Sequence, residues 1–195
     1  MGRVSKEQAL QNREKIIAIA CGLFRQHGVE NVSISDIMQA AQLTNGGFYK
    51  QFSSKDELVV EAFELAFKQS SDTWRKIQNE HSSARNGMFS IAQHYFKPKR
   101  NEQNCPMLIL SSIVSNFPSD QKITESYTSG VHQLFQQFLD EQKRAFPEVS
   151  AAESKQKAML AFTAMLGTGL LTRAMSDDPW VKELQTEILK ALSNL

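Results

Sequence analysis

A run of small and hydrogen-bonding side chains, Thr-Asn-Gly-Gly-Phe-Tyr-Lys-Gln, occupies residues 44–51. Asn and Gln can each form two hydrogen bonds with an adenine edge, and a Lys ammonium can donate to guanine or to a phosphate. The two adjacent glycines let another backbone approach closely because they carry no side chain. Tyr49 and Lys50 suit phosphate contacts, and Lys55 falls where the first turn of a further helix would offer N–H groups to a phosphate. This pattern predicts contact with duplex DNA.

Two short helices must position these side chains, and the start signals of both are present. Residues 33–36, Ser-Ile-Ser-Asp, form a variant capping box with Asp where Glu or Gln is usual, which predicts a helix that ends near Ala41. After a short turn, Thr44 is placed to cap a second helix, in which Phe48 and Phe52 lie four residues apart and face inward. This is the helix-turn-helix arrangement, whose second helix enters the major groove.

Longer helices are predicted on both sides of this pair. Residues 6–26 carry one apolar face and precede Gly28, a C-cap residue type, and residues 54–57 form a full capping box that opens a fourth helix. Nearly the whole chain has an apolar period near 3.6 residues, so we expect an all-α fold of about nine helices. The remaining helices are expected near residues 84–96, 105–117, 119–145, 151–176 and 179–193.

Composition limits the class of protein. The chain has 195 residues, 41% of them hydrophobic, and a net charge of +1, as expected of an ordinary globular protein. Residues 1–55 contain 7 Lys+Arg against 4 Asp+Glu, whereas residues 56–195 contain 15 Lys+Arg against 17 Asp+Glu. The excess of basic residues therefore lies in the N-terminal part of the chain. That excess is compatible with nucleic-acid contact. With no apolar stretch long enough for a membrane span or a secretory signal, we expect a cytoplasmic location without membrane contact.

The two cysteines, Cys21 and Cys105, are too few for a disulfide framework. The four histidines are too scattered to form a zinc site with them. No cluster of His, Cys, Ser or carboxylate residues has the spacing of a nucleophile and its base. We therefore expect no bound metal, no cofactor and no enzymatic activity, and we expect Cys21 to be a packing residue on the inner face of the first helix.

The stretch from residue 33 to residue 58, with the helix before it, resembles the N-terminal DNA-binding domain of the TetR/AcrR family of transcriptional regulators. The resemblance covers roughly residues 10–62. It implies a three-helix helix-turn-helix domain over residues 1–56 and a helical sensor and dimerisation domain over residues 57–195.

Carried over position by position, the resemblance implies two kinds of DNA contact. Residues expected to face the bases are Ser35, Asn45, Gly46, Gly47 and Lys50, of which Lys50 can also reach a phosphate. Residues expected to hold phosphates are Ser33, Thr44, Tyr49 and Lys55. Two positions depart from the family pattern, because Gly47 stands where Thr is frequent and Gln42 stands where the turn usually has Gly.

In this family the final helices usually form a homodimer interface. The residues expected there are Phe162, Met165, Leu166, Gly169, Leu170, Trp180, Leu184 and Ile188. The small residues 167–169 would let two helices approach closely, and a dimer would place two recognition helices about 34–36 Å apart, or a multiple of that distance. The alternative is that these residues belong to a core within one chain.

Apolar side chains further along the chain can wall a cavity for a small ligand. They are Phe89, Tyr95, Phe96, Met107, Ile113, Phe117, Tyr127, Leu134 and Phe138. A packed core explains the same residues equally well.

Cys105 precedes Pro106 at the expected start of a helix, where the helix dipole and unpaired N–H groups stabilise a thiolate. Residues 104–114 resemble a stretch in family members that sense electrophiles or hypochlorite through this cysteine. The resemblance places Arg173 near a Lys that is thought to assist the thiol. It implies that modification of Cys105 shifts the dimer away from its DNA-binding spacing. The alternative is a buried, inert thiol.

These observations predict a homodimeric repressor that binds a near-palindromic double-stranded DNA operator. Release would follow binding of a small apolar or electrophilic inducer, or modification of Cys105. A different class stays open, namely an all-helical adaptor that binds a protein or peptide in a groove and has no role on DNA. Salt-dependent binding to random duplex DNA distinguishes the two classes.

Overall fold

The computed structural model describes residues 5–97, 105–116 and 121–193. Every regular element in these residues is an α-helix, which confirms the predicted all-α class. None of the described helices is long and apolar enough to cross a membrane. Packing divides the chain into two compact units, a first unit of Met1–Lys68 with Arg100–Gly130 and a second unit of Gln69–Lys99 with Val131–Leu195.

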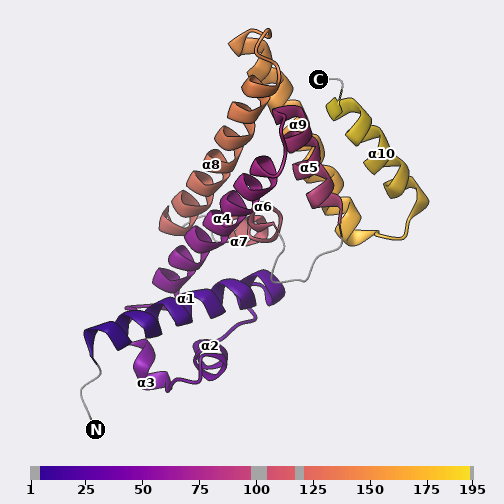
Figure 1. Ribbon diagram of the computed structural model, residues 1–195. Coiled ribbons are helices and arrows are strands. Elements are labelled where there is room, and N and C mark those ends of the chain that lie inside the picture. The colour runs from indigo at the N-terminus through magenta and orange to yellow at the C-terminus, as the bar shows by residue number, and fades with distance from the viewer. Residues whose placement is uncertain (1–4, 98–104, 117–120, 194–195) are drawn as a thin grey trace. The chain divides into compact units, whose positions relative to one another are not determined.

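The first unit contains the helices that carry the predicted DNA contacts. Its elements are α1 (Lys6–His27), α2 (Ile34–Ala40), α3 (Asn45–Phe48), α6 (Pro106–Ile109), α7 (Ser111–Asn116) and the first parts of α4 (Lys55–Asn79) and α8 (Gln121–Ala145). α2 packs against α1, and α3 packs against α2 (Figure 1). The predicted functional boundary at residue 56 stays a prediction, and packing assigns α4 as far as Lys68 to this unit.

One apolar core joins these elements. Its large buried side chains from α1 to α4 include Ile16, Phe24, Ile37, Met38, Phe48, Phe52, Leu58 and Phe63. Leu110, Ile113 and Ile123 join the same core from the later segment. Each such side chain contributes about 1.5–3 kcal/mol when it leaves water, so burial rather than helix propensity holds the short α2 and α3 in place.

Local signals end α1 and begin α2 as predicted. Gly28 is the C-cap of α1, with a φ of 82° that favours glycine. Ser33 and Asp36 form the predicted capping box at α2. The Ser33 hydroxyl accepts a hydrogen bond from the Asp36 N–H at 3.1 Å, and the Asp36 carboxylate accepts one from the Ser33 N–H at 2.8 Å.

Two details of the predicted helices are wrong. Thr44 occupies the N-cap of α3, but its hydroxyl makes no capping hydrogen bond. The segment 105–117, predicted as one helix, is divided into α6 and α7. The hydroxyls of Ser111 and Ser112 donate to the carbonyls of Leu108 and Ile109, at 3.0 and 3.3 Å, and such bonds compete with the helical ladder.

The second unit combines the later parts of α4 and α8 with α5 (Ala84–Phe96), α9 (Ala151–Ala174) and α10 (Pro179–Ser193). α5, α9 and α10 pack against one another. Trp74 of α4 is buried within this unit. Its ring makes edge-on contacts with Tyr95, Phe138 and Phe162 at centroid distances of 6.0, 6.2 and 6.3 Å. An aromatic cluster is therefore the centre of this core.

The turn between α2 and α3 depends on a residue with an unfavourable backbone. Gln42 has a φ of 57°, in the left-handed region that favours glycine. This conformation lets the Leu43 N–H donate to the Met38 carbonyl at 2.9 Å, which closes the end of α2. The departure from the family's turn glycine therefore leaves strain in this turn.

We predict that Gln42→Gly raises the free energy of unfolding by roughly 0.5–1 kcal/mol. Relief of the left-handed strain should exceed the added freedom of glycine in the unfolded chain. Gln42→Ala keeps the Cβ atom and should stay close to the wild type. Urea unfolding of the three proteins measures both effects, and a Gln42→Gly protein no more stable than Gln42→Ala would contradict the prediction.

Candidate nucleic-acid interface

α2, α3 and the turn after α3 present an outward face that is polar. Its exposed members are Ser33, Ser35, Thr44, Asn45, Gly46, Tyr49 and Lys50. The Asn45 amide donates to the Ser35 hydroxyl over 3.4 Å, so two residues predicted to read bases meet although they belong to different helices. Phe48 is buried on the opposite side of α3. The structure therefore separates the predicted contact residues from the residue that anchors them.

The two glycines of α3 are not required by packing within the chain. A Cβ atom at Gly46 would have nothing within 4 Å. One at Gly47 would lie 3.6 Å from Met38 Cε and 3.8 Å from Thr44 Oγ1, which are ordinary contact distances. The surface here is open to close approach by another molecule, and the chain has room for the Thr that the family often carries at this position.

Two of the predicted phosphate-binding side chains are already engaged within the chain. The Ser33 hydroxyl donates to the Asp36 carboxylate at 2.6 Å, and this bond lowers the pKa of Asp36. The Lys55 ammonium donates to the Val29 carbonyl at 2.6 Å. An ammonium has three donors, so Lys55 keeps donors for a further acceptor, whereas Ser33 would have to release Asp36 to donate to a phosphate.

Arg13 of α1 joins the end of this face to the start of α4. Its guanidinium donates to the Gln51 carbonyl and the Glu61 carboxylate, and lies 3.2 Å from Glu57 Oε1. It also lies over the Phe52 ring, 4.1 Å from the ring centroid. One cation therefore connects α1, the turn after α3 and the first two turns of α4.

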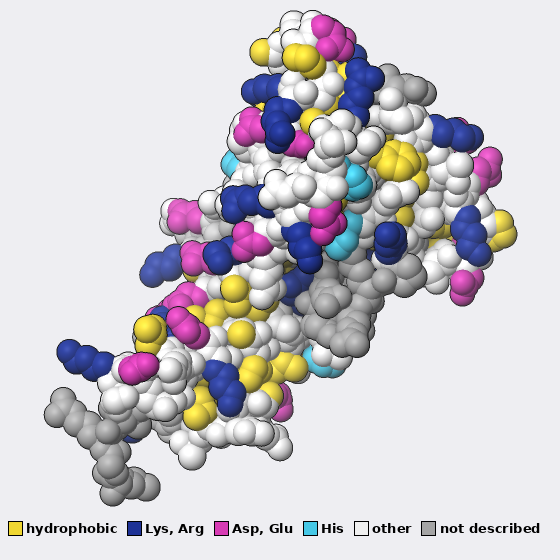
Figure 2. Space-filling view, viewed as in Figure 1, with side chains coloured by type: hydrophobic (Ala, Val, Ile, Leu, Met, Phe, Trp, Pro, Cys, Tyr) yellow, Lys and Arg dark blue, Asp and Glu magenta, His cyan; other side chains and the backbone are white. Residues whose placement is uncertain are grey.

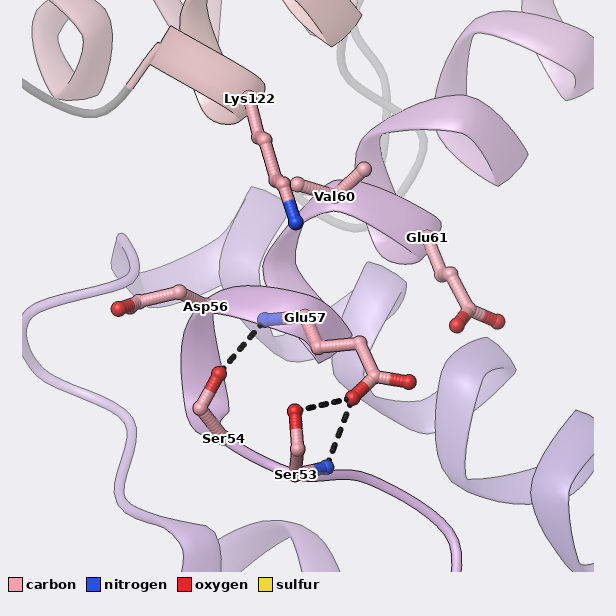
Figure 3. Close-up of a pocket in the computed structure, with 7 residues that line it drawn as sticks. All are labelled: Ser53, Ser54, Asp56, Glu57, Val60, Glu61 and Lys122. Atoms are coloured by element: carbon pink, nitrogen blue, oxygen red, sulfur yellow. Dashed lines mark hydrogen bonds between the residues drawn. The ribbon is translucent and has the colours of Figure 1, made fainter.

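Glu57 completes the start of α4, although not in the predicted way. Its N–H donates to the Ser54 hydroxyl at 3.1 Å, as in a capping box. Its carboxylate instead accepts bonds from the hydroxyl and the N–H of Ser53, both at 2.7 Å (Figure 3). These two bonds, with a smaller contribution from Arg13, lower the pKa of Glu57 from 4.5 to about 2.

The helices that carry this face match a known family. Residues 16–62 match the family model for bacterial regulatory proteins of the tetR family. This segment is a tetR-family helix-turn-helix domain. Over 66 residues the chain is 38% identical to the HTH-type transcriptional regulator AcrR of Shigella flexneri, which covers 34% of this chain and 31% of that protein. Over 61 residues it is 38% identical to the probable acrEF/envCD operon repressor of Escherichia coli strain K12, which covers 31% of this chain and 28% of that protein. The chain therefore matches less than a third of the length of these relatives.

Solved structures extend the likeness beyond the tetR domain. A TetR-family transcriptional regulator from Cytophaga hutchinsonii has a TM-score of 0.82 and 14% identity, over 100% of this chain and 98% of that one. The reduced form of NemR from E. coli has a TM-score of 0.80 and 18% identity, over 94% of this chain and 96% of that one. At these identities the likeness shows that the fold is shared.

A pocket of about 420 Å³ adjoins the tetR domain at the start of α4. Its lining residues are Ser53, Ser54, Asp56, Glu57, Val60, Glu61 and Lys122 (Figure 3). They are mostly charged or hydroxyl-bearing, and none belongs to the set predicted to line an apolar ligand pocket. On the face of the molecule in Figure 2, basic and acidic side chains of the described residues are interspersed rather than separated into patches.

The residues predicted to line a ligand pocket belong to both units. Met107, Ile113 and Tyr127 lie in the first unit, Phe89, Tyr95, Phe96, Leu134 and Phe138 lie in the second, and Phe117 lies outside the described residues. The pocket therefore stays a prediction. Trp74, at the centre of the second unit's core, was not among the predicted residues. Phe67 and Phe63 precede it by seven and eleven residues, a helical spacing that indicates a shared buried face.

The residues predicted at a dimer interface differ in exposure. Phe162, Met165 and Gly169 are buried within the chain, and a Cβ atom at Gly169 would lie 3.2 Å from Tyr95 Cδ1. These three residues fit the alternative, a core within one chain. Others point outward: Leu170 is 51% exposed and Trp180 is 54% exposed. Leu166, Leu184 and Ile188 are half-buried.

Cys105 is the N-cap of α6 and is buried, with 7% of its surface exposed. Burial raises the pKa of Tyr127, and the charge of a Cys105 thiolate would raise it further. Arg173, which the resemblance places near the position of a Lys thought to assist the thiol, belongs to the second unit. Cys21 is buried in the core of the first unit, as predicted, and burial raises its pKa.

The lowered pKa of Glu57 predicts a specific dependence of stability on pH. Because the folded pKa of about 2 lies below the ordinary value of 4.5, the ionised carboxylate stabilises the fold above about pH 4.5. This contribution is lost as the pH falls toward 2. Thermal unfolding of Glu57→Gln across this window should therefore show a shallower loss of stability than the wild type.

Ser53→Ala removes one donor to the same carboxylate and should give an intermediate slope. Parallel curves for the wild type and Glu57→Gln would show that the Ser53 and Arg13 contacts do not stabilise the ionised form.

Proposed function

We propose that this chain is a transcriptional repressor whose tetR domain binds a near-palindromic duplex DNA operator as a homodimer. One observation carries the proposal: Asn45 and Ser35 meet on an exposed polar face that buried Phe48 anchors from behind. Asn side chains recognise adenine edges, and a helix held in this way can enter a major groove. The relatives that match the tetR domain include a protein named as an operon repressor.

The phosphate-binding residues and the base-reading residues would have different roles on DNA. Thr44, Tyr49 and Lys55 would hold phosphates and set the position of the domain, which carries little sequence information. Asn45 and Lys50, with Ser35, would read base edges. Gly47 offers no side chain at a position where the family often has a hydroxyl. Sequence choice would therefore depend more strongly on these three readers.

The outward side of α9 and the start of α10 would form the homodimer interface. Leu160 and Leu170 are 64% and 51% exposed, and Trp180 is 54% exposed. Gly167 has open space where a Cβ atom would lie, so a second helix could approach α9 closely there. Large apolar side chains exposed on the surface of a helix are frequent at protein interfaces.

Release of DNA would follow a change in the part of the chain outside the tetR domain. A small apolar inducer bound among the predicted pocket residues is one route. Modification of Cys105 is the other, because a group added to a buried thiol must displace α6 around it. The E. coli neighbour NemR was solved in a form named as reduced, which supports testing this thiol.

Removing two of the proposed DNA contacts should weaken binding in a salt-dependent way. Lys50→Ala combined with Lys55→Ala should lower affinity for duplex DNA and reduce the slope of log affinity against log salt by up to about two, since each Lys that neutralises DNA charge releases counterions. Fluorescence anisotropy over a range of salt concentrations measures both quantities.

Lys76→Ala combined with Lys143→Ala removes the same charge at exposed positions of α4 and α8, outside both proposed surfaces, and is the matched control. An equal loss for both double variants would show that the effect comes from net charge alone. Far-ultraviolet circular dichroism confirms that each variant is folded, which matters because Lys55 also binds the Val29 carbonyl.

Iodoacetamide tests the role of Cys105. We predict that it releases DNA from a Cys21→Ser protein, in which Cys105 is the remaining cysteine, and not from a Cys21→Ser/Cys105→Ser protein, which has none. Mass spectrometry of the same samples reports whether the thiol was alkylated. Equal release from both proteins, or full alkylation without release, would remove Cys105 from the mechanism.

A further inference from the structure

Gly130 lies in the middle of α8, a place where glycine weakens a helix. The ring of Phe67, from α4, lies directly on it. A Cβ atom at Gly130 would be 2.7 Å from Phe67 Cδ1 and closer still to Cγ and Cδ2, nearer than real Cβ contacts come. Phe67 is only 2% exposed, so its ring cannot turn into solvent to make room. Glycine at this position is therefore required by the contact with α4.

Tyr127 lies three residues before Gly130 and so on the same side of α8. Its ring meets the Phe67 ring edge-on, with centroids 5.7 Å apart. Its hydroxyl donates to the Met107 carbonyl of α6 at 2.8 Å. Tyr127 therefore touches α4 with its ring and α6 with its hydroxyl.

α4 connects this contact to the tetR domain. Between Lys55 and Phe67 the helix places Leu58, Val59, Ala62, Phe63 and Ala66 in the core shared with α1, α2 and α3. Its first two turns are bound by Arg13 through Glu57 and Glu61. The distance from Phe67 to the start of α4 is about 18 Å along a rigid helix. Phe67 therefore lies on the same helix as the side chains that pack against α1, α2 and α3.

We propose that Tyr127 and Gly130 form a seat on α8 that fixes Phe67, and with it α4, and that the Tyr127–Met107 bond passes a displacement of α6 to the tetR domain. This inference rests on the proposed function and names the residues through which DNA binding would be regulated. Tyr127 and Gly130 are positioning residues, since neither belongs to the face that would meet DNA.

The seat is tested by filling it. Gly130→Ala should lower affinity about tenfold for a duplex that the wild type selects from a random pool. Gly130→Ala/Phe67→Leu, which makes room for the added methyl group, should recover most of that loss. Ser129→Ala adds helix propensity at the neighbouring exposed position and should bind as the wild type does. A folded Gly130→Ala protein with wild-type affinity, or a folded double variant without recovery, would overturn the proposal.

The link to α6 needs a separate cycle. Cys105→Phe adds bulk at the N-cap of α6 and should weaken DNA binding, whereas in the Tyr127→Phe background, which lacks the bond to Met107, the loss should be several-fold smaller. The same loss in both backgrounds, or no loss in either, would show that Tyr127 does not transmit a change at α6.

Amide hydrogen exchange separates failure of this inference from failure of the proposed function. If the wild type selects no duplex, the proposed function fails, and the seat is judged on exchange alone. Filling it should then speed exchange in residues 45–59 in Gly130→Ala and not in Ser129→Ala. Unchanged exchange there would overturn the seat independently of any DNA.

Discussion

A helix of four residues, α3, carries the centre of the face proposed to meet DNA, and a single helical turn has almost no stability of its own in water. Its position depends on what lies behind it. Phe48 and Phe52 stack at 5.4 Å between centroids and are buried in the core, and Arg13 from α1 lies over Phe52. Every exposed side chain on α3 is placed by this buried side. The packing of the first unit therefore holds this one short turn of helix in place.

Different interactions stabilise the first unit and orient the turn after α3 relative to α4. The apolar core that spans α1 to α4 supplies most of the stabilisation, because large side chains leave water there. Arg13, Glu57 and Glu61 are partly exposed, and ion pairs of that kind add little net stability. Their effect is directional, since one guanidinium has to satisfy acceptors on the turn after α3 and on α4 together. The core thus holds the helices together, and the charged cluster fixes how the turn meets α4.

Glycine has opposite roles at different positions in this chain. Gly46 and Gly47 face open space or ordinary contacts, so packing in the described residues does not require their small size. Gly130 and Gly169 are crowded by Phe67 and Tyr95, so their small size serves contacts within the chain. Gly167 and Gly169 are only two residues apart in α9, yet Gly167 faces open space and Gly169 is crowded by Tyr95. A pattern of small residues alone therefore does not indicate a helix–helix interface between subunits.

The sequence by itself determined the all-α class and the ends of the first two helices, although not the division of residues 105–117 into α6 and α7. The Ser33–Asp36 capping box, the Gly28 C-cap and the inward placement of Phe48 depend on contacts within a few residues, which local spacing reveals. Only the tertiary structure decided which partners Arg13 binds, that Phe67 lies on Gly130, and that Phe162 and Met165 are buried in the chain rather than exposed for a partner. These depend on residues dozens of positions apart. Helical periodicity shows which apolar side chains share one face of a helix, but it does not show which other helix covers that face.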